Sequence, residues 1–378
     1  MRILLVGEYS RFHNSLKEGL EELGHQAVII SDNDFKNYPI DINIYAKYFQ
    51  DNYILNKIRQ AIFRISKVDV AQIEVGLRFY ANRNKLKGFD VVQLINEYAI
   101  QSTPSMEIQL LKFLFRNNKK SFLVSCGDDY VCVNYMLSGK FKYSVLTPCE
   151  AYPEANHCKF TLKFATKPFQ KIHEFVYSNI RAVIAGDMDY YIPLRNNPKC
   201  AGLIPYAINI KKQQYEPVPV TDKIVIFHGI NVANYYKKGN YLFEQALDII
   251  AAKFADKVQI ITTRSVPYSE YIQKYDRAHI LLDQVFAYDQ GYNALEAMAK
   301  GKVVFTGAET EFMQHYQLDD RVAVNALPDA EAIANDLEQL INNPHEIAEI
   351  GKRARAFVER EHDYLKVAQQ YLDVWSKH

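Results

Sequence analysis

The sequence predicts an α/β protein of two domains, each with a parallel β-sheet covered by helices on both faces. The chain has 378 residues, which corresponds to roughly two to three domains of about 150 residues. Short apolar runs alternate with segments whose apolar residues recur at helical spacing, and the alternation occurs in two separate series. Because alternating strands and helices are typical of parallel sheets, two consecutive α/β domains are the simplest architecture.

The first series begins with the first residues of the chain. Residues 2–6 are largely apolar, the leucines of residues 16–23 recur at helical spacing, and Gly24 ends that helix before the apolar run of residues 27–30. This order predicts a strand, a helix and a second strand. Further buried strands are predicted at Val91–Ile95, Phe122–Ser125 and Ala182–Ala185. The first domain is expected to span residues 1–205.

Residues 35–88 interrupt this alternation and are predicted to form a helical insertion rich in aromatic and basic residues. Two interpretations are open for this insertion. It is either a helix that covers the core and leaves a charged edge in solvent, or a basic amphipathic surface that contacts the anionic inner face of a membrane. The apolar residues near one helical face are Tyr53, Ile54, Ile58, Ile62 and Phe63.

A second series begins at Lys223, after a polar linker at residues 211–221 that contains proline. It predicts a second domain at residues 206–360 and a terminal helix at residues 361–378. Asp363 is expected to cap the terminal helix, whose apolar stripe must pack against another element. That stripe consists of Leu365, Ala368, Leu372 and Trp375. The other predicted elements are strands at Ile224–Phe227, Val258–Thr262, Ile280–Asp283 and Val303–Phe305, and helices at Tyr241–Phe254, Tyr292–Ala299 and from Pro344, with Asn343 as its cap.

The composition excludes several classes of protein. The chain has 45 Lys and Arg against 44 Asp and Glu, a net charge of +1, so nucleic acid is not an expected partner. No run approaches the roughly 20 apolar residues of a spanning helix, and the first residues lack the apolar core of a signal peptide. We therefore expect a cytoplasmic protein. The five cysteines, an odd number at positions 126, 132, 149, 158 and 200, favour reduced thiols over a disulfide scaffold.

Sequence motifs for several chemistries are missing. Cys149 and Cys158, with His157 beside them, lack the short paired spacing of a structural zinc site, so no metal is expected. The stretch from Gly7 to Phe12 does not provide the Gly-x-Gly-x-x-Gly pattern of a dinucleotide site. A Gly-x-Ser-x-Gly nucleophile turn is also missing. Hydride transfer and serine-based hydrolysis are therefore disfavoured.

The most informative stretch is residues 281–304, where a predicted strand is followed by a loop and a helix that begins at Gly291. The free N–H groups of a helix start attract phosphate, and a glycine allows close approach to the backbone. Glu296 lies about one turn into the helix and offers two oxygens to sugar hydroxyls. A site that binds a diphosphate at the helix start and ribose hydroxyls at Glu296 would bind a nucleotide.

These residues resemble those of glycosyltransferases with the GT-B architecture, in particular the retaining GT4-like group. The segments that carry the resemblance are Gly291–Glu296 with Ala297-Met298-Ala299, Gly301 and Val303-Val304, Arg2–Gly7 with Gly24-His25, Phe89–Gln93, Ile204–Asn209, and Lys238-Gly239 with Leu242 and Ala246. The resemblance implies two Rossmann-like domains that face each other across a cleft, with the terminal helix crossing back to the first domain. Where the group has a second glutamate, this chain has Tyr288, followed by Asp289.

The resemblance also implies site residues. Lys238, Tyr288 and Asp289 are expected to be catalytic, with Lys238 neutralising the leaving diphosphate. The expected donor-binding residues are Gly229, Asn231, Lys237, Lys238, Thr263, Asp283, Gln284, Gly291, Tyr292, Asn293, Ala294 and Glu296. The expected acceptor-side residues are Gly7, Glu8, Asn96, Glu97, Gly127 and Asp128.

The predicted function is transfer of a sugar from a nucleotide-diphosphate sugar to a glycan or lipid-linked acceptor, with retention, in the synthesis of surface polysaccharide or glycoconjugate. Lysine and a helix dipole can stabilise the leaving group, so neither a cofactor nor a metal is expected. Two alternatives are open: a nucleotide-sugar epimerase on the same fold, and a non-catalytic nucleotide- or sugar-binding relative.

Overall fold

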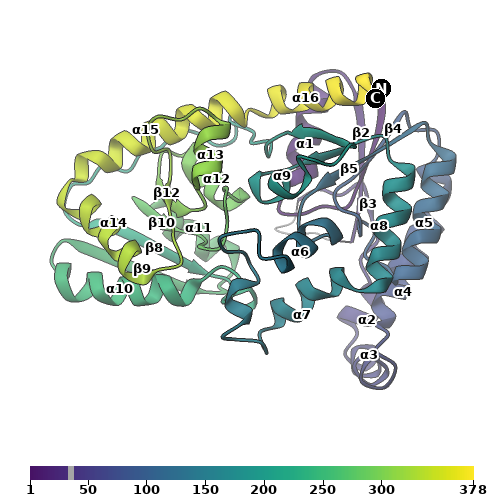
Figure 1. The fold of residues 1–378 in the computed structure, drawn as a ribbon, viewed down its shortest axis with the longest axis horizontal. Coiled ribbons are helices and arrows are strands. Elements are labelled where there is room, and N and C mark those ends of the chain that lie inside the picture. The colour runs from purple at the N-terminus through teal and green to yellow at the C-terminus, as the bar shows by residue number, and fades with distance from the viewer. Residues whose placement is uncertain (33–37) are drawn as a thin grey trace.

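A computed structural model describes residues 1–32 and 38–378, which form two α/β domains lying side by side (Figure 1). The first domain contains a seven-stranded parallel sheet of order β3-β2-β1-β4-β5-β6-β7. The second contains a five-stranded parallel sheet of order β12-β11-β10-β8-β9. The strands are β1 (Arg2–Val6), β2 (Gln26–Ser31), β3 (Ile42–Asn43), β4 (Val91–Leu94), β5 (Lys120–Ser125), β6 (Val183–Ala185), β7 (Cys200–Leu203), β8 (Ile224–Ile230), β9 (Val258–Arg264), β10 (Ile280–Leu282), β11 (Val303–Thr306) and β12 (Val324–Asn325).

Helices cover both sheets. In the first domain they are α1 (Phe12–Glu22), α2 (Lys47–Asp51), α3 (Tyr53–Ser66), α4 (Val70–Ala81), α5 (Pro104–Asn117), α6 (Tyr130–Leu137), α7 (Asn156–Leu162), α8 (Lys167–Asn179) and α9 (Met188–Leu194). After them come α10 (Asn240–Phe254), α11 (Tyr268–Asp276), α12 (Tyr292–Ala299), α13 (Thr310–His315), α14 (Ala330–Asn342), α15 (Pro344–Glu361) and α16 (Tyr364–Lys377). None of the helices among the described residues is both long enough and apolar enough to span a membrane.

The order of strands places a topological switch point in each sheet. In the first sheet, β1 lies between β2 and β4, so the chain leaves β1 on one side and later returns on the other. In the second sheet, β8 lies in the same way between β9 and β10. Ligands of open parallel sheets bind outside the carboxyl ends of the strands at such a switch point. The loops after β1, β4, β8 and β10 are therefore the positions where a site is expected.

The terminal helix α16 returns to the first domain and packs on α1 (Figure 1). Asp363 caps it, because its carboxylate accepts hydrogen bonds from the N–H groups of residues 365 and 366. Gly19 of α1 allows the close approach, since a Cβ there would lie 2.4 Å from the Tyr364 carbonyl oxygen. Trp375, almost fully buried, donates from Nε1 to Gln93 Oε1 at 2.9 Å. The stripe of α16 thus completes the core of the first domain.

The structure adds detail at three places. Leu23 has the helical spacing of Leu16 and Leu20, but α1 ends at Glu22 and Leu23 is exposed. Asn343 is the cap residue of α15, as expected, but its side chain makes no capping hydrogen bond. The insertion forms α2, α3 and α4, and α3 has no buried residue, so of the two open interpretations a helix that covers the core does not apply to α3. The first residues of the predicted insertion, 35–37, lie outside the described residues.

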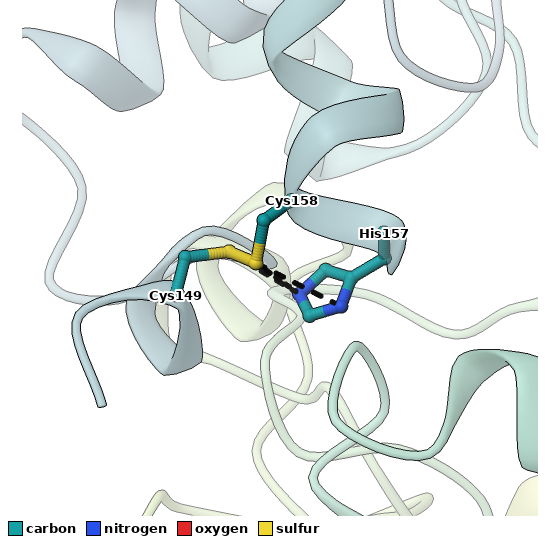
Figure 2. A group of neighbouring side chains, drawn as sticks. All are labelled: Cys149, His157 and Cys158. Carbon is teal, nitrogen blue, oxygen red and sulfur yellow. Dashed lines mark hydrogen bonds between the residues drawn. A yellow bond between two sulfur atoms is a disulfide. The ribbon is translucent and has the colours of Figure 1, made fainter. Parts of the chain in front are cut away.

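The expectation of reduced cysteines was wrong for one pair. Cys149 and Cys158 form a disulfide, with Cα atoms 5.9 Å apart, whereas Cys126, Cys132 and Cys200 are free. The chain turns back between a short 3-10 helix at Thr147–Cys149 and the start of α7, which brings the two cysteines together (Figure 2). The two cysteines are nine residues apart in sequence, and this spacing does not predict the turn that joins them.

Candidate active site

A pocket of about 610 Å³ lies at the carboxyl ends of β8, β9 and β10, at the switch point of the second sheet. Its walls come from the second domain except for Ser10, which belongs to the loop after β1 of the first domain. The pocket is therefore placed where an open parallel sheet binds its ligand. Its lining residues include Gly229, Ile230, Asn231, Asn234, Lys238, Thr263, Ser265, Tyr268, Tyr271, Asp283, Gln284, Gly291, Tyr292 and Asn293.

Helix α12 begins at this pocket with an uncovered first turn. Gly291 precedes it with φ −82° and ψ 171°, an ordinary extended conformation, and no side chain caps the helix. A Cβ at Gly291 would meet only the side-chain end of Gln284, at 3.9 Å. The glycine is thus not required by the backbone but leaves the space before the helix open. The first N–H groups of a helix have no intrahelical partner and carry partial positive charge, so they can receive an anion here.

A cation lies beside this helix start. Lys238 Nζ donates to Asp283 Oδ1 at 2.8 Å, and Asn293 Nδ2 donates to the same oxygen at 3.2 Å. Asp283 is buried, and its second oxygen, Oδ2, has no hydrogen-bond partner among the described residues. Lys238 is about one-third exposed and lines the pocket. The pair holds the ammonium group at the pocket wall, where a diphosphate would meet it.

Glycine at position 229 shapes the opposite wall. A Cβ there would lie 2.4 Å from Tyr271 Cε2, so only glycine allows the tyrosine ring to pack against the end of β8. Tyr271 donates its hydroxyl to Asn293 Oδ1 at 3.0 Å, which fixes the ring. The neighbouring Tyr268 stacks on Tyr271 with ring centroids 6.4 Å apart and is 46% exposed. An exposed ring at the pocket rim offers a flat apolar surface to a ligand.

Of the residues expected to bind a donor, nine line the pocket: Gly229, Asn231, Lys238, Thr263, Asp283, Gln284, Gly291, Tyr292 and Asn293. Ala294 is buried within α12. Lys237 points instead to the first domain, where Nζ lies 3.1 Å from Asp128 Oδ2. Glu296 lies at the domain boundary, with Oε1 3.8 Å from an Arg11 guanidinium nitrogen.

Tyr288 and Asp289, which were expected to be catalytic, do not line the pocket. Tyr288 is buried against the first domain: its hydroxyl accepts from Lys142 N at 2.8 Å, and its ring packs on Phe141 and Tyr143. Asp289 Oδ2 accepts from Met188 N at 3.2 Å. The loop after β10 therefore turns away from the pocket beyond Gln284 and returns to it at Gly291. No sequence pattern indicates this detour, because the direction of the loop depends on its contacts with the first domain.

Three carboxyl groups meet in this interface: Asp187 and Asp189 from the first domain and Asp289 from the second. Asp189 accepts from Tyr288 N at 3.1 Å, and Asp187 accepts from the Tyr206 hydroxyl at 2.6 Å. Burial raises the pKa of each of the three groups, and the neighbouring carboxylates raise the pKa of Asp189 and Asp289 further. The contact between the domains is therefore favoured when these groups are protonated.

Three of the six expected acceptor-side residues make hydrogen bonds within the first domain. Glu8 accepts from Asn14 N and Nδ2 at 2.8 Å each, and burial raises its pKa to about 7. Asn96 Nδ2 donates to the Cys126 carbonyl at 3.0 Å and so supports the loop after β5. Glu97 Oε1 pairs with His173 Nδ1 at 2.7 Å inside the domain.

The remaining three acceptor-side residues are Gly7, Gly127 and Asp128. Gly127 has φ +81°, which favours glycine. Asp128 accepts from Thr161 and from Lys237 across the boundary. Gly7, with φ +85°, packs tightly on Ile95, since a Cβ would lie 2.4 Å from Ile95 Cγ2. Among the described residues, Asp128 is thus linked to the second domain by the Lys237 ammonium group.

Sequence reasoning missed Arg11. Arg11 and the preceding Ser10 have φ values of 80° and 52°, which are unusual for residues other than glycine. This backbone places the Arg11 guanidinium between Glu18 of its own domain and Glu296 of the second domain, at 3.3 Å and 3.8 Å. Strained residues of this kind cluster at functional sites. No pattern in the sequence distinguishes this arginine from any other in a turn.

The described residues contain one group that could hold a metal, Cys149, His157 and Cys158, whose ligand atoms all lie within 4.8 Å of one another (Figure 2). The disulfide uses both sulfur atoms. His157 Nε2 lies 3.4 Å from Cys149 Sγ and 3.1 Å from the Val145 carbonyl oxygen. A cysteine binds zinc only as a thiolate, so in the disulfide form these two cysteines cannot serve as zinc ligands.

Two domains, each with a parallel sheet covered by helices, are the architecture of the GT-B class of fold. Residues 239–373 match the family model described as glycosyl transferase-like. A search of curated protein sequences finds no match. The second domain is therefore a glycosyltransferase-like domain.

Solved structures match over the whole chain. Sucrose-phosphate synthase from Thermosynechococcus elongatus is similar with a TM-score of 0.62 and 14% identity, covering 100% of this chain and 99% of that one. Anabaena HepE in complex with UDP and glucose has a TM-score of 0.59 and 12% identity, with complete coverage of both chains. The lipopolysaccharide outer core galactosyltransferase WaaB has a TM-score of 0.54 and 10% identity, also with complete coverage. At these identities the likeness shows the fold, and that fold is GT-B.

Proposed function

We propose that the protein is a glycosyltransferase that uses a nucleotide-diphosphate sugar as donor. One observation carries the proposal: the open start of α12 and the Lys238 ammonium group meet in one pocket at the switch point of the second sheet. The glycosyl transferase-like domain at residues 239–373 and the UDP bound by the similar HepE structure support it. The pocket volume of about 610 Å³ lies within the range of about 300–1,000 Å³ that is usual for small-molecule ligands.

The proposed binding mode assigns each part of the pocket to one part of the donor. The N–H groups at the start of α12 receive the diphosphate, and Lys238 neutralises the charge that grows on it as the sugar leaves. The exposed ring of Tyr268 provides a stacking surface for the base. Glu296 lies outside the pocket lining, at the domain boundary beside Arg11, and is proposed to accept from sugar hydroxyls there. We propose that no metal is needed, because lysine and helix dipole supply the positive charge.

The proposed acceptor is a glycan or a lipid-linked saccharide, bound on the side of the first domain, with transfer under retention. A phosphate oxygen of the leaving diphosphate can take the proton of the acceptor hydroxyl, so no side-chain base is required. The contacts between the domains exclude water and limit hydrolysis of the donor. We propose a cytoplasmic enzyme that reaches a membrane-bound acceptor from the inner face of the membrane, in the synthesis of surface polysaccharide or glycoconjugate.

A second candidate is a non-catalytic nucleotide-binding relative. The observation that favours it is the burial of Tyr288 and Asp289 in the interface, which leaves the sugar end of the pocket without the carboxylate expected there. Such a protein would bind nucleotide but release none from a nucleotide sugar.

The experiment has two stages. Thermal unfolding is first measured with UDP, GDP, ADP and CDP, and we expect one of them to raise the unfolding temperature, since a ligand at 100 times its dissociation constant stabilises by about 2.7 kcal/mol. Release of that nucleoside diphosphate from its sugar conjugates is then measured with and without saccharide acceptors. Acceptor-dependent release supports the transferase, and binding without release supports the non-catalytic relative. No stabilisation by any of the four would overturn both.

A further inference from the structure

Helix α3 is an amphipathic helix whose apolar face has no partner within the described residues. It packs on its neighbours α2 and α4, and it projects from the end of the first domain (Figure 1). None of its 14 residues is buried. Ile54, Ile58, Ile62 and Ile65 recur at spacings of four, four and three residues, so they form one stripe along the helix. Ile54 is 68% exposed and Ile65 is 88% exposed. Four exposed isoleucines on one helical face form a contiguous apolar patch, and such a patch indicates a binding surface for a partner.

The charge around α3 indicates what kind of occupant fits. Residues 47–87, from α2 to the segment after α4, contain nine basic and three acidic side chains, whereas the whole chain has a net charge of only +1. All three acidic groups are already engaged: Asp51 with Tyr45, Asp69 with Arg59 and Glu74 with Arg78. Seven basic side chains have no carboxylate partner among the described residues: Lys47, Lys57, Arg64, Lys67, Arg83, Lys85 and Lys87. The surface is therefore complementary to a negative one.

The apolar and the basic residues together suit a surface that is apolar inside and negative outside. On a helical projection Lys57 and Arg64 flank the isoleucine stripe on one side. The helix is about 21 Å long, so it would lie in the plane of a bilayer and not across it. A nucleic acid would leave the isoleucines in water. An anionic bilayer buries the isoleucines below its headgroups and attracts the lysines and arginine, and stable binding at an interface generally needs both contributions.

We infer that α3, with the basic residues around it, docks this protein on an anionic lipid bilayer. The isoleucine stripe enters the boundary between headgroups and acyl chains, and the basic side chains contact lipid phosphates. The biological role of this docking rests on the proposed function, because docking would bring the first domain to a lipid-linked acceptor in the same membrane. The docking itself needs no nucleotide and no turnover, so it can fail or succeed separately.

The test is flotation of the full chain with large vesicles, in the absence of nucleotide. One set contains phosphatidylcholine alone, and the other contains phosphatidylcholine with 30% phosphatidylglycerol. We expect at least about tenfold tighter binding to the anionic vesicles, and loss of that preference at high salt. Equal binding to both sets, or binding to neither, would overturn the inference.

Two variants identify the surface. Ile58→Glu with Ile62→Glu, and separately Lys57→Glu with Arg64→Glu, should each weaken binding to anionic vesicles at least about tenfold. These side chains are exposed, so the unfolding temperature should stay the same. The matched control is Leu137→Glu with Leu327→Glu, two exposed apolar residues elsewhere, which should bind as the unaltered chain does.

Unchanged vesicle binding in both α3 variants would overturn the assignment. So would a concentration-dependent dimer that the isoleucine variant converts to a monomer, since the stripe would then be covered by a second copy.

Release of nucleoside diphosphate with a water-soluble acceptor should be the same in the α3 variants as in the unaltered chain. If that activity is missing in the unaltered chain while vesicle binding is present, the proposed function fails and the docking stands.

Discussion

Lys238 Nζ lies 2.8 Å from Asp283 Oδ1 at the wall of the pocket, whereas the adjacent Lys237 lies 3.1 Å from Asp128 of the other domain. The two lysines are adjacent in sequence, but the Lys238 side chain lies at the pocket and the Lys237 side chain contacts the first domain. Because α10 begins directly after them, at Asn240, their side chains are held on different sides of the turn that precedes the helix.

This difference predicts that two matched variants lose nucleotide affinity to very different extents. Lys238→Ala should weaken binding of the nucleoside diphosphate by about 10–100-fold, because it removes the cation at the pocket and leaves Asp283 buried without its charge partner. Lys237→Ala should change nucleotide affinity by less than about threefold, since its partner lies outside the pocket. Isothermal titration of both variants measures this. Equal losses in the two would contradict the assignment of the lysines.

The three carboxyl groups between the domains predict a pH dependence of stability. A carboxyl group in the unfolded chain titrates near pH 3.9. The raised pKa values of Asp187, Asp189 and Asp289 mean that the folded protein binds more protons than the unfolded chain above that pH. The free energy of unfolding therefore falls as the pH rises from about 4 through these raised values.

Asp289→Asn isolates this effect, because asparagine keeps the shape and cannot ionise. Relative to the unaltered chain, we expect the variant to be more stable by about 1–2 kcal/mol at pH 8 and to lose this advantage at pH 5. Urea unfolding at the two pH values measures the difference. An advantage that is the same at both values would show that ionisation of Asp289 does not oppose folding.

The disulfide between Cys149 and Cys158 predicts a redox dependence of stability. A closed loop of nine residues of separation constrains the unfolded chain by about 2–3 kcal/mol. A reducing agent should therefore lower the free energy of unfolding by about this amount. In the variant Cys149→Ser with Cys158→Ser, the same agent should have no effect, because Cys126, Cys132 and Cys200 are already free. A reducing agent that destabilises both proteins equally would contradict the pairing.

The elements of the fold could be predicted because their causes are local in the sequence. Strand β1 is an apolar run that a parallel sheet buries on both faces, and the alternation of such runs with amphipathic helices is visible along the chain. The start of α12 could be placed because a glycine precedes a helical pattern. Its position at a pocket follows from the order of strands, which the two α/β series imply.

The parts that could not be predicted depend on contacts between segments that are distant in sequence. Tyr288 was expected at the sugar, but Phe141 and Tyr143 of the first domain hold its ring. The environment of Arg11 depends on the left-handed backbone conformation of Ser10 and Arg11, which these residue types do not predict. The face of α3 has the periodicity of a core helix, and only the fold shows that the core lies elsewhere.

The most direct measurement is titration of the stabilising nucleoside diphosphate into Gly291→Leu. The residue has an ordinary extended backbone and open space before it, so leucine should fold normally and fill the approach to the helix start. We predict an unfolding temperature close to that of the unaltered chain and a loss of affinity of at least about 100-fold, which corresponds to about 2.7 kcal/mol. Unchanged affinity in a folded Gly291→Leu protein would show that the diphosphate does not bind at α12.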